Sequence, residues 1–312
     1  MDAVILMKRL QMILIVILAA FLPVTVLLKI PLPNPQTPTA PTSQGTQDIP
    51  GKIQVLNKDG SVVWQDLEDY VTCVVLQEMP ASFEVEALKA QAVAARTYAL
   101  RGGRHGEALV CTDYTCCQAY CRPEDYLGTA AELDKVRTAV KETAGQVLLY
   151  EGQLIDAVYF SCSGGQTEDA KAVWGVDVPY LQSVPSPGEE QAEHYTETIR
   201  FSAKAFSELF DGLTGYAGSW IGEVTWTTGG GVATISIGGQ VYTGTSVRER
   251  LGLRSTAFRI SAVGETVTVT TKGYGHRVGM SQYGADAMAL TGATYLEILA
   301  HYYPGTELSY TD

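Results

Sequence analysis

Nineteen consecutive residues without a charged side chain, Leu10 to Leu28, constrain the organisation of this chain more than any other feature. A helix of that length, at about 1.5 Å per residue, spans roughly the 30 Å hydrocarbon layer of a bilayer. Lys8 and Arg9 precede the run, whereas only Lys29 follows it closely. By the positive-inside rule we expect residues 1–9 in the cytoplasm, the uncharged run as a transmembrane helix (residues 10–28) and the rest of the chain outside.

A cleaved signal peptide is the alternative. The apolar run exceeds the usual signal-peptide core of about 7–15 residues, and no Ala-x-Ala-like cleavage site follows Leu28. Residues 29–50 then hold six of the 13 prolines among Thr, Ser and Gln, a composition typical of an extended linker. We therefore expect one extracytoplasmic domain, residues 51–312, carried by a single-pass anchor in the cell membrane.

The charge balance of the outer part argues against one class of partner. The chain has 22 basic and 34 acidic side chains, of which three and two lie in the first 50 residues, so residues 51–312 carry a net charge of −13. A nucleic-acid-binding domain needs a basic surface to meet phosphates. The sequence therefore predicts no nucleic-acid partner.

Hydrophobic periodicity predicts an α+β fold of mixed helices and antiparallel strands. Pro80 stops the first expected helix, and Ser82 is a candidate N-cap for the second, with acidic residues in its first turn. The expected helices cover residues 69–79, 82–101, 132–143, 281–290 and 295–302. The expected strands cover residues 52–56 and 61–64 and two strand pairs, 147–150 with 154–160 and 221–226 with 232–237.

A carboxylate at a helix break is the first candidate for chemistry. Glu78 follows the apolar run Val74–Leu76 and stands two residues before Pro80. Burial there would raise its pKa, and a carboxyl that is protonated at neutral pH is a usable general acid. The alternative is a solvent-facing glutamate at a helix end. Lys89 and Arg96, seven residues apart on one face of the next helix, offer cations to oxygen-rich ligands or to carboxylates.

Several blocks resemble one known family in sequence and in order. Residues 78–101, EMPASFEVEALKAQAVAARTYALR, are similar to the hallmark segment of the stage II sporulation protein D family, peptidoglycan lytic transglycosylases of endospore-forming bacteria. Five further blocks follow in the family's order: CTDYTCCQAY (111–120), YFSCSGGQTEDAKAVW (159–174), VPYLQSV (178–184), GYGHRVGMSQYGADAMA (273–289) and YLEILAHYYPG (295–305). The resemblance spans roughly residues 52–305.

The resemblance implies that Glu78 is the catalytic acid, because it occupies the family's catalytic glutamate position. In a lytic transglycosylase one carboxyl protonates the glycosidic oxygen between N-acetylmuramic acid and N-acetylglucosamine. As carboxylate it then takes a proton from the muramoyl 6-hydroxyl, which closes a 1,6-anhydro end. Hydrolysis ordinarily needs a second carboxylate, and Glu84, Glu86 and Glu168 leave that alternative open.

The resemblance and two polar blocks also imply a glycan-binding set. The serines near residue 160 suit a groove lining better than a nucleophile, because no Ser-His-Asp set surrounds them. The glycine-rich block near residue 275 offers a planar ring and hydrogen bonds for a sugar. The expected substrate-binding residues are Lys89, Arg96, Tyr159, Ser161, Ser163, Tyr274, His276, Ser281 and Gln282. Lys89 and Arg96 are assigned either to glycan binding or to orienting the catalytic glutamate.

Two positions within these blocks depart from the family. Phe160 stands where family members usually carry His, so a hydrogen bond is lost there. Arg277 stands where Gly is common. If that position needs a positive φ, an arginine there is strained.

Four nitrogen or sulfur ligands lie within 13 residues, a set that suits tetrahedral zinc: His105, Cys111, Cys116 and Cys117. The family pattern has His where Cys116 stands, and the adjacency of two of the cysteines strains simultaneous coordination. Cys121 is therefore an alternative fourth ligand, and a disulfide is the alternative to a metal outside the cytoplasm. We expect a structural Zn²⁺, because acid catalysis by a glutamate does not need the ion.

Taken together, the resemblance implies a membrane-anchored lytic transglycosylase. It would cleave glycan strands stripped of stem peptides during engulfment in endospore formation, on the mother-cell side facing the septal wall. The implied protein partners are the amidase stage II sporulation protein P and stage II sporulation protein M. Two alternatives stay open: a non-catalytic cell-wall-binding or amidase-activating module, and a redox or metal-sensing surface protein based on its thiols.

Overall fold

The computed structural model describes residues 51–102, 105 and 110–311. The predicted transmembrane helix and the linker lie outside the described residues. Within the described ranges, no helix is both long enough and apolar enough to cross a bilayer. Helices mix with mainly antiparallel strands in this part of the chain, which confirms the α+β class there.

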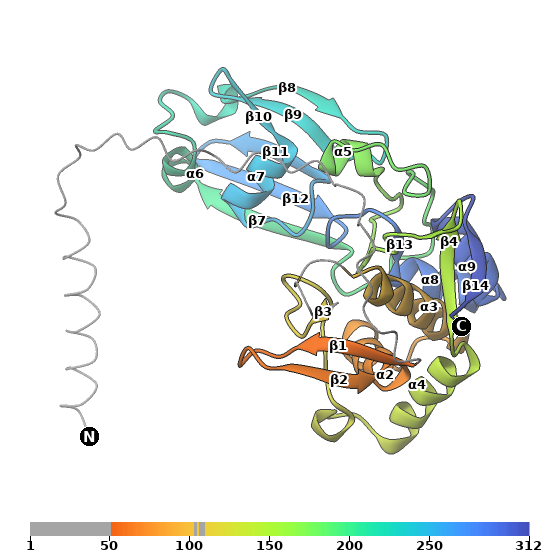
Figure 1. The fold of residues 1–312 in the computed structure, drawn as a ribbon. Helices are drawn as coiled ribbons and strands as arrows, with labels where there is room; N and C mark the ends of the chain where they lie inside the picture. Colours follow the sequence, from red (N-terminus) through yellow and green to blue (C-terminus); the bar gives the residue numbers. More distant parts are fainter. Residues whose placement is uncertain (1–50, 103–104, 106–109, 312) are drawn as a thin grey trace, which may run out of the picture. The chain divides into compact units, whose positions relative to one another are not determined.

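An alanine-rich helix lies at the centre of the first of two hydrophobic cores. This helix, α3 (Val85–Arg101), packs against α2 (Leu67–Glu78), α4 (Ala130–Glu142), α8 (Gln282–Leu290) and α9 (Tyr295–Tyr302) (Figure 1). Six of its alanines are fully buried. Because an alanine presents only a methyl group, neighbouring helices can approach α3 closely from several sides. These five helices confirm the five that the sequence predicts, to within a few residues at their ends.

The boundaries of α2 follow from local chemistry. The side chain of Asp66 accepts hydrogen bonds from the main-chain N–H groups of Glu68 and Asp69, which caps the N-terminus. Met79 has an extended backbone (φ −130°, ψ 133°) and Pro80 follows it, so the helix cannot continue. The last helical residue is therefore the glutamate that the sequence singles out.

The predicted cap of α3 is wrong. The N-cap position is occupied by Glu84 and not by Ser82, and the Glu84 side chain makes no capping hydrogen bond. Instead, the carboxylate of Asp286 on α8 accepts a hydrogen bond from the Glu84 N–H at 2.7 Å. Asp286, 202 residues away in the sequence, thus satisfies the main-chain N–H at the start of α3. No local sequence pattern can predict this contact.

Small sheets surround the first core. β1 (Lys52–Leu56) pairs antiparallel with β2 (Val62–Asp66) and parallel with β3 (Val110–Cys111). β4 (Gln146–Tyr150) lies between β5 (Gln153–Leu154) and β14 (Glu307–Tyr310), and β6 (Tyr159–Phe160) pairs parallel with β13 (Met280–Ser281). Short helical turns η1 (Pro123–Asp125) and α5 (Ala170–Trp174) complete this part.

The expected continuous strand over residues 154–160 is also wrong. The chain turns between β5 and β6, where the N–H of Val158 donates to the carbonyl of Asp156 at 2.8 Å. Ile155 and Ala157 are fully buried in the core on either side of Asp156. Each half of the segment therefore pairs with a different strand, β5 with β4 and β6 with β13.

A second core is built from residues 196–272. Its two three-stranded antiparallel sheets have the orders β10-β9-β8 and β11-β12-β7, and aromatic and β-branched side chains such as Phe206, Trp220 and Val269 fill its interior. The elements are β7 (Thr196–Ser202), α6 (Ala203–Leu209), η2 (Ala217–Ser219), β8 (Ile221–Trp226), β9 (Val232–Ile237), β10 (Gln240–Thr243), α7 (Gly244–Leu251), β11 (Phe258–Val263) and β12 (Thr266–Lys272). The predicted β8–β9 pair is confirmed, whereas the second sheet was not predicted.

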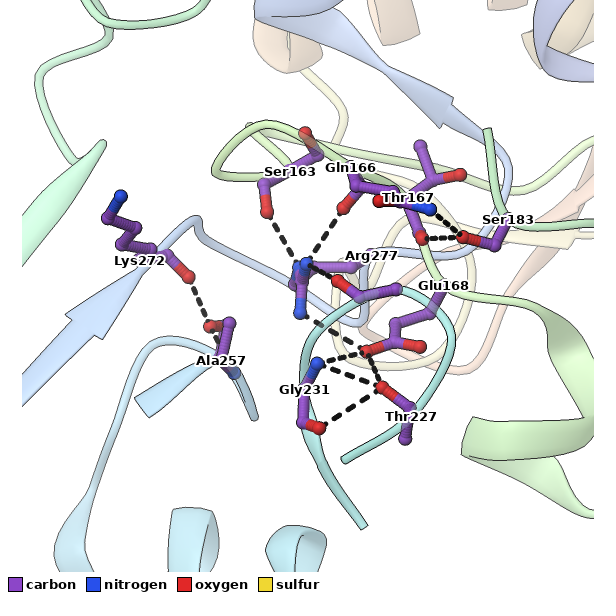
Figure 2. A network of polar contacts seen from close by, with 12 residues as sticks. Ser163, Gln166, Thr167, Glu168, Ser183, Thr227, Gly231, Ala257, Lys272 and Arg277 are labelled. Carbon is purple, nitrogen blue, oxygen red and sulfur yellow. Dashed lines mark hydrogen bonds and ion pairs between the residues drawn. The ribbon is translucent and has the colours of Figure 1, made fainter. Parts of the chain in front are cut away.

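Arg277 joins loops of both regions (Figure 2). Its side chain is 2% exposed and donates hydrogen bonds to the carbonyl oxygens of Ser163 (2.7 Å), Gln166 (2.7 Å) and Gly229 (2.6 Å). It also pairs with the carboxylate of Glu168 at 3.2 Å. Gly229 lies in the β8–β9 turn, so one guanidinium cross-links that turn to the loop after β6.

The backbone of Arg277 has φ 67°, which lies in the left-handed region. The condition for strain at this position, a positive φ, is therefore met. For a residue with a Cβ this conformation costs roughly 1–2 kcal/mol. The four contacts of the guanidinium, one of them a buried ion pair, offset that cost. Oε1 of Glu168 is further satisfied by the Thr227 hydroxyl (2.7 Å) and the Gly231 N–H (2.9 Å).

We expect Arg277→Gly to destabilise the protein by about 2–4 kcal/mol. Glycine relieves the backbone strain, but it leaves the buried Glu168 carboxylate without its cation, and breaking a buried pair costs roughly 3–5 kcal/mol. The double variant Arg277→Gly/Glu168→Gln should recover part of the loss, because no unpaired charge remains. Denaturant unfolding measures both, and an Arg277→Gly protein as stable as the parent would contradict this role.

Candidate functional site

Glu78 is the last residue of a helix whose other residues are mostly buried. Tyr70, Val71, Val74 and Val75 of α2 are fully buried, and the Glu78 side chain reaches the edge of that apolar packing, where it is half-buried. The helix end therefore holds a carboxyl group against the core while leaving part of it open to a ligand.

Two distant segments contact the Glu78 carboxylate. Its Oε1 accepts a hydrogen bond from the main-chain N–H of Ala119 at 2.6 Å. Its Oε2 lies 3.4 Å from the side-chain amide nitrogen of Gln282, at the start of α8. Of the sequence-predicted substrate residues, Gln282 is thus one that the fold brings directly to Glu78.

Burial raises the pKa of Glu78, while the Ala119 N–H and the Gln282 amide act in the opposite direction. Desolvation is the largest of these effects, so the neutral carboxyl persists to higher pH than in an exposed glutamate. This is the electrostatic condition for a general acid.

None of the three other carboxylates considered as a partner for Glu78 contacts it within the described residues. Glu84 is exposed at the N-cap of α3. Glu86 pairs with Lys89 at 2.9 Å and accepts the N–H of Tyr295. Glu168 is fully buried and is held by Arg277, so it has no exposed oxygen for a substrate.

A buried amide links two tyrosines beside Glu78. Gln118 is 2% exposed; its oxygen accepts from the Tyr159 hydroxyl at 2.7 Å, and its nitrogen donates to the Tyr70 hydroxyl at 3.1 Å. Burial and the Glu78 charge both raise the pKa of Tyr159, which stays a hydrogen-bond donor. The predicted Tyr159 therefore belongs to the site. Sequence reasoning missed Gln118 and Ala119, although both stand in the block that follows the vicinal cysteines.

The four predicted metal ligands converge. The ligand atoms of His105, Cys111, Cys116 and Cys117 all lie within 4.8 Å of one another. Nε2 of His105 is 3.1 Å from Sγ of Cys117 and 3.5 Å from Sγ of Cys116, close to the spacing of roughly 3.5 Å between donors in a tetrahedral zinc site. Cys121 is outside this group, and its thiol donates to the carbonyl of Arg122.

This cluster of one imidazole and three thiols fits a structural zinc ion by donor type and by geometry. It also lies in the same loop as the main-chain donor to Glu78, since Ala119 comes two residues after Cys117. A metal bound there would hold the loop that positions the Glu78 carboxylate.

Lys89 and Arg96 form ion pairs away from Glu78. Lys89 lies 2.9 Å from Glu86 and 2.7 Å from Glu142 of α4. Arg96 is fully buried; it pairs with Glu68 and donates to the carbonyl of Gln146 at 3.1 Å. Neither contacts Glu78 among the described interactions, and Arg96 has no surface to offer a glycan. We therefore assign Arg96 to the joining of α2, α3 and β4.

The remaining predicted residues divide into buried and exposed ones. Ser163 is fully buried and hydrogen-bonds Glu189 through its N–H (2.7 Å) and its hydroxyl (2.8 Å). Ser281 is fully buried as the N-cap of α8. Ser161 is partly exposed, and its carbonyl accepts the N–H of Tyr283 at 3.0 Å. The two serines that are buried thus support the backbone of the site and do not line a groove.

Aromatic rings lie next to these serines. Tyr274 is 40% exposed, with the guanidinium of Arg254 4.9 Å from its ring centre. His276 packs against Phe160 (5.6 Å) and Trp174 (5.4 Å), and burial lowers the pKa of His276 to about 4, so the ring is neutral. The sequence predicts that Phe160 loses a hydrogen bond usual in the family. In the structure Phe160 instead packs its ring against His276. Tyr274 is thus exposed, whereas His276 is held among aromatic side chains.

Comparison with known proteins gives one consistent result. The profile of the family described as "Stage II sporulation protein" matches residues 57–150. The chain is 41% identical over 290 residues to Stage II sporulation protein D of Bacillus subtilis (strain 168), covering 88% of this chain and 84% of that protein. It is also 41% identical over 258 residues to Stage II sporulation protein D of Bacillus amyloliquefaciens, covering 79% and 75%. The Amidase enhancer of Bacillus subtilis (strain 168) is 31% identical over 290 residues, covering 76% of this chain and 40% of that protein.

We expect Glu78→Gln to stabilise the protein in a pH-dependent way. The folded-state pKa of Glu78 is raised by burial, so the wild type is favoured while the carboxyl is neutral and loses that stability as the pH rises through the folded-state value. The variant has no such charge. Its unfolding free energy minus that of the wild type should therefore increase as the pH rises above the ordinary glutamate pKa of about 4.3.

Thermal and denaturant unfolding across that pH range check this expectation. The exposed Glu84→Gln is the matched control, because it removes a surface charge near the same helix break. A Glu78→Gln difference that stays constant or decreases with pH would contradict a raised pKa.

Proposed function

This chain belongs to the stage II sporulation protein D family, and we propose that it is a peptidoglycan lytic transglycosylase of endospore formation. The observation that carries the proposal is the environment of Glu78, a half-buried carboxyl whose pKa is raised by burial and whose two oxygens lie against the Ala119 N–H and the Gln282 amide. A hydrolase of the usual kind pairs two carboxyl groups about 5–9.5 Å apart across the bond. The single-acid scheme needs only Glu78, and two of the three other candidate carboxylates, Glu86 and Glu168, are already paired with Lys89 and Arg277.

In the first step Glu78 donates its proton to the glycosidic oxygen between N-acetylmuramic acid and N-acetylglucosamine. The bond from the muramoyl C1 to that oxygen breaks, and the N-acetylglucosamine leaves with a 4-hydroxyl that carries the proton. Oε1 accepts the short hydrogen bond from the Ala119 N–H at 2.6 Å, whereas Oε2 has only the longer contact with the Gln282 amide at 3.4 Å, so we place the proton on Oε2. Positive charge develops at C1 as the bond breaks.

In the second step the Glu78 carboxylate takes the proton of the muramoyl 6-hydroxyl. The oxygen of that hydroxyl bonds to C1 and closes the 1,6-anhydro ring, and Glu78 is left protonated for the next cycle. The Ala119 N–H stabilises the carboxylate between the two steps. Burial keeps its proton affinity high enough for both transfers.

We assign a structural Zn²⁺ to His105, Cys111, Cys116 and Cys117 on the convergence of their ligand atoms. When bound, the ion supplies a cross-link and no chemical step. The residues that act on Glu78 are those that follow the ligands, the N–H of Ala119 and the amide of Gln118 that holds Tyr159.

Family membership supports the wider setting of the proposal. We propose that the chain is anchored in the cell membrane and acts on glycan strands whose stem peptides have been removed, together with stage II sporulation proteins P and M. The 31% identity to an amidase enhancer supports the rival, a non-catalytic module that binds the wall or activates an amidase. Only product analysis separates the two.

We expect the full-length chain to convert peptide-free glycan strands to fragments with 1,6-anhydromuramoyl ends, detected by mass spectrometry. Glu78→Gln should reduce the rate at least about 100-fold, since general acid–base catalysis contributes at least that much. Glu84→Gln, which changes an exposed glutamate six residues further along the chain, should retain activity. No cleavage by the wild type, with binding retained, would support the non-catalytic module; reducing ends would mean hydrolysis.

We expect one zinc ion per chain by elemental analysis. Cys117→Ser should lose the ion and lower Tm by several degrees, because the loop loses its cross-link. Cys121→Ser is the matched control, since Cys121 lies outside the ligand group, and it should retain both. Zinc-free wild-type protein, or equal loss of metal in both variants, would overturn this ligand assignment.

A further inference from the structure

A pocket of about 340 Å³ lies apart from the contacts of Glu78. Its lining comes from four places: the loop after β6, the β8–β9 turn, the outer side of the β11–β12 pair and Arg277. The β11–β12 register places Arg259 opposite Thr270, and Lys272 follows two residues later on the same face. The other face of these strands, with Phe258, packs into the second core.

The pocket lining is positively charged, whereas the domain as a whole is negatively charged. Residues 51–312 carry a net charge of −13, yet the lining includes Arg259, Lys272 and Arg277, and none of the described lining residues is acidic. Arg277 is neutralised by Glu168 behind it. Arg259 and Lys272 are exposed and take part in none of the ion pairs of the described residues. Two uncompensated cations therefore face the pocket.

A flat aromatic surface lies beside one of these cations. The guanidinium of Arg259 is 4.6 Å from the ring centre of Trp226, which is 43% exposed. Stacking on the indole ring holds the guanidinium in a fixed plane. The ammonium of Lys272 lies 5.8 Å from the Tyr195 ring. An arginine held in this way is suited to bidentate binding of a carboxylate.

Glycine residues form much of the remaining pocket lining. Gly165 (φ 115°) and Gly230 (φ 76°) have left-handed backbones, and a Cβ at Gly230 would meet nothing within 4 Å. A Cβ at Gly164 would meet the Cβ of Lys272 at 2.9 Å, so Gly164 packs directly against β12, and a Cβ at Gly229 would meet the carbonyl oxygen of Thr167 at 2.3 Å. This part of the lining is backbone, and Arg277 holds it by donating hydrogen bonds to the carbonyl oxygens of Gln166 (Figure 2) and of Gly229.

We propose that this pocket binds a sugar that bears a free carboxylate, the muramoyl residue of a glycan strand whose stem peptide has been removed. The inference rests on the proposed function, and it names the site that would distinguish stripped strands from others. A stem peptide converts the lactyl carboxylate into a neutral amide and adds bulk. Both changes remove the group that Arg259 and Lys272 bind.

The pocket is close enough to Glu78 for one strand to reach both. Tyr159 lies beside Glu78, and Gly164, five residues later, lines the pocket. Five residues span at most about 18 Å. Between these two points Cys162 and Tyr274 exchange main-chain hydrogen bonds (3.3 and 2.7 Å), so the exposed residue Tyr274 belongs to the same stretch of the surface.

The test measures binding without cleavage. The full-length Glu78→Gln chain is titrated calorimetrically with a peptide-free muramoyl glycan and with the same glycan after conversion of its lactyl carboxylates to methylamides. We expect the acid to bind about tenfold more tightly or better, since a hydrogen bond to a charged group contributes at least that much. Added salt should weaken binding of the acid more than that of the amide.

Variants assign the preference to the pocket. Arg259→Gln/Lys272→Gln should remove the preference for the acid. Arg200→Gln should keep it, because Arg200 lies opposite Thr268 on the same sheet but outside the pocket lining. Equal affinities for acid and amide in the parent would overturn the proposal, as would a preference that persists in the double variant with unchanged Tm.

Failure here is distinguishable from failure of the proposed function. Anhydro products together with charge-independent binding would reject the pocket and keep the transglycosylase. Charge-dependent binding without anhydro products would keep carboxylate recognition and reject the reaction.

Discussion

The hydrogen bond from the Ala119 N–H to the Glu78 carboxylate is the contact on which the proposed chemistry depends. It joins residues 41 positions apart, and the Gln282 amide reaches the same carboxylate from 204 positions away. Its geometry is maintained from two sides. The packing of α2 against the alanine-rich α3 fixes the helix end that carries Glu78, and the proposed zinc ion on the cluster of one histidine and three cysteines would fix the loop that carries Ala119.

The second core takes no part in the contacts of Glu78 but supports the pocket that carries Arg259 and Lys272. It presents a sheet face with unpaired cations. Arg277 connects the two regions by bonding to Ser163 on one side and to Gly229 in the β8–β9 turn on the other. An arginine with a left-handed backbone is retained there because it neutralises a buried glutamate, a role that a glycine cannot fill.

Features that depend on neighbouring residues in the sequence could be predicted from it. The break after Glu78 follows from Pro80, and the ligand set at residues 105–117 follows from residue type and spacing. Roles set by distant partners were not predictable: Arg96 is matched with Glu68 and Gln146 only by the packing of α3, and Ser163 is buried because Glu189 folds over it. The β7–β12 pairing was missed because it joins strands from distant parts of the chain, whereas the β11–β12 hairpin is local and its alternating pattern was overlooked.

The central claim is that one carboxyl serves as acid and then as base, with the muramoyl 6-hydroxyl in place of water. Cleavage of peptide-free glycan strands by the wild-type chain in water labelled with oxygen-18 tests it most directly. The account predicts that mass spectrometry finds anhydromuramoyl ends without the heavy isotope. Incorporation of one labelled oxygen at the new muramoyl end would contradict it, because water would then be the nucleophile and a base besides Glu78 would be required.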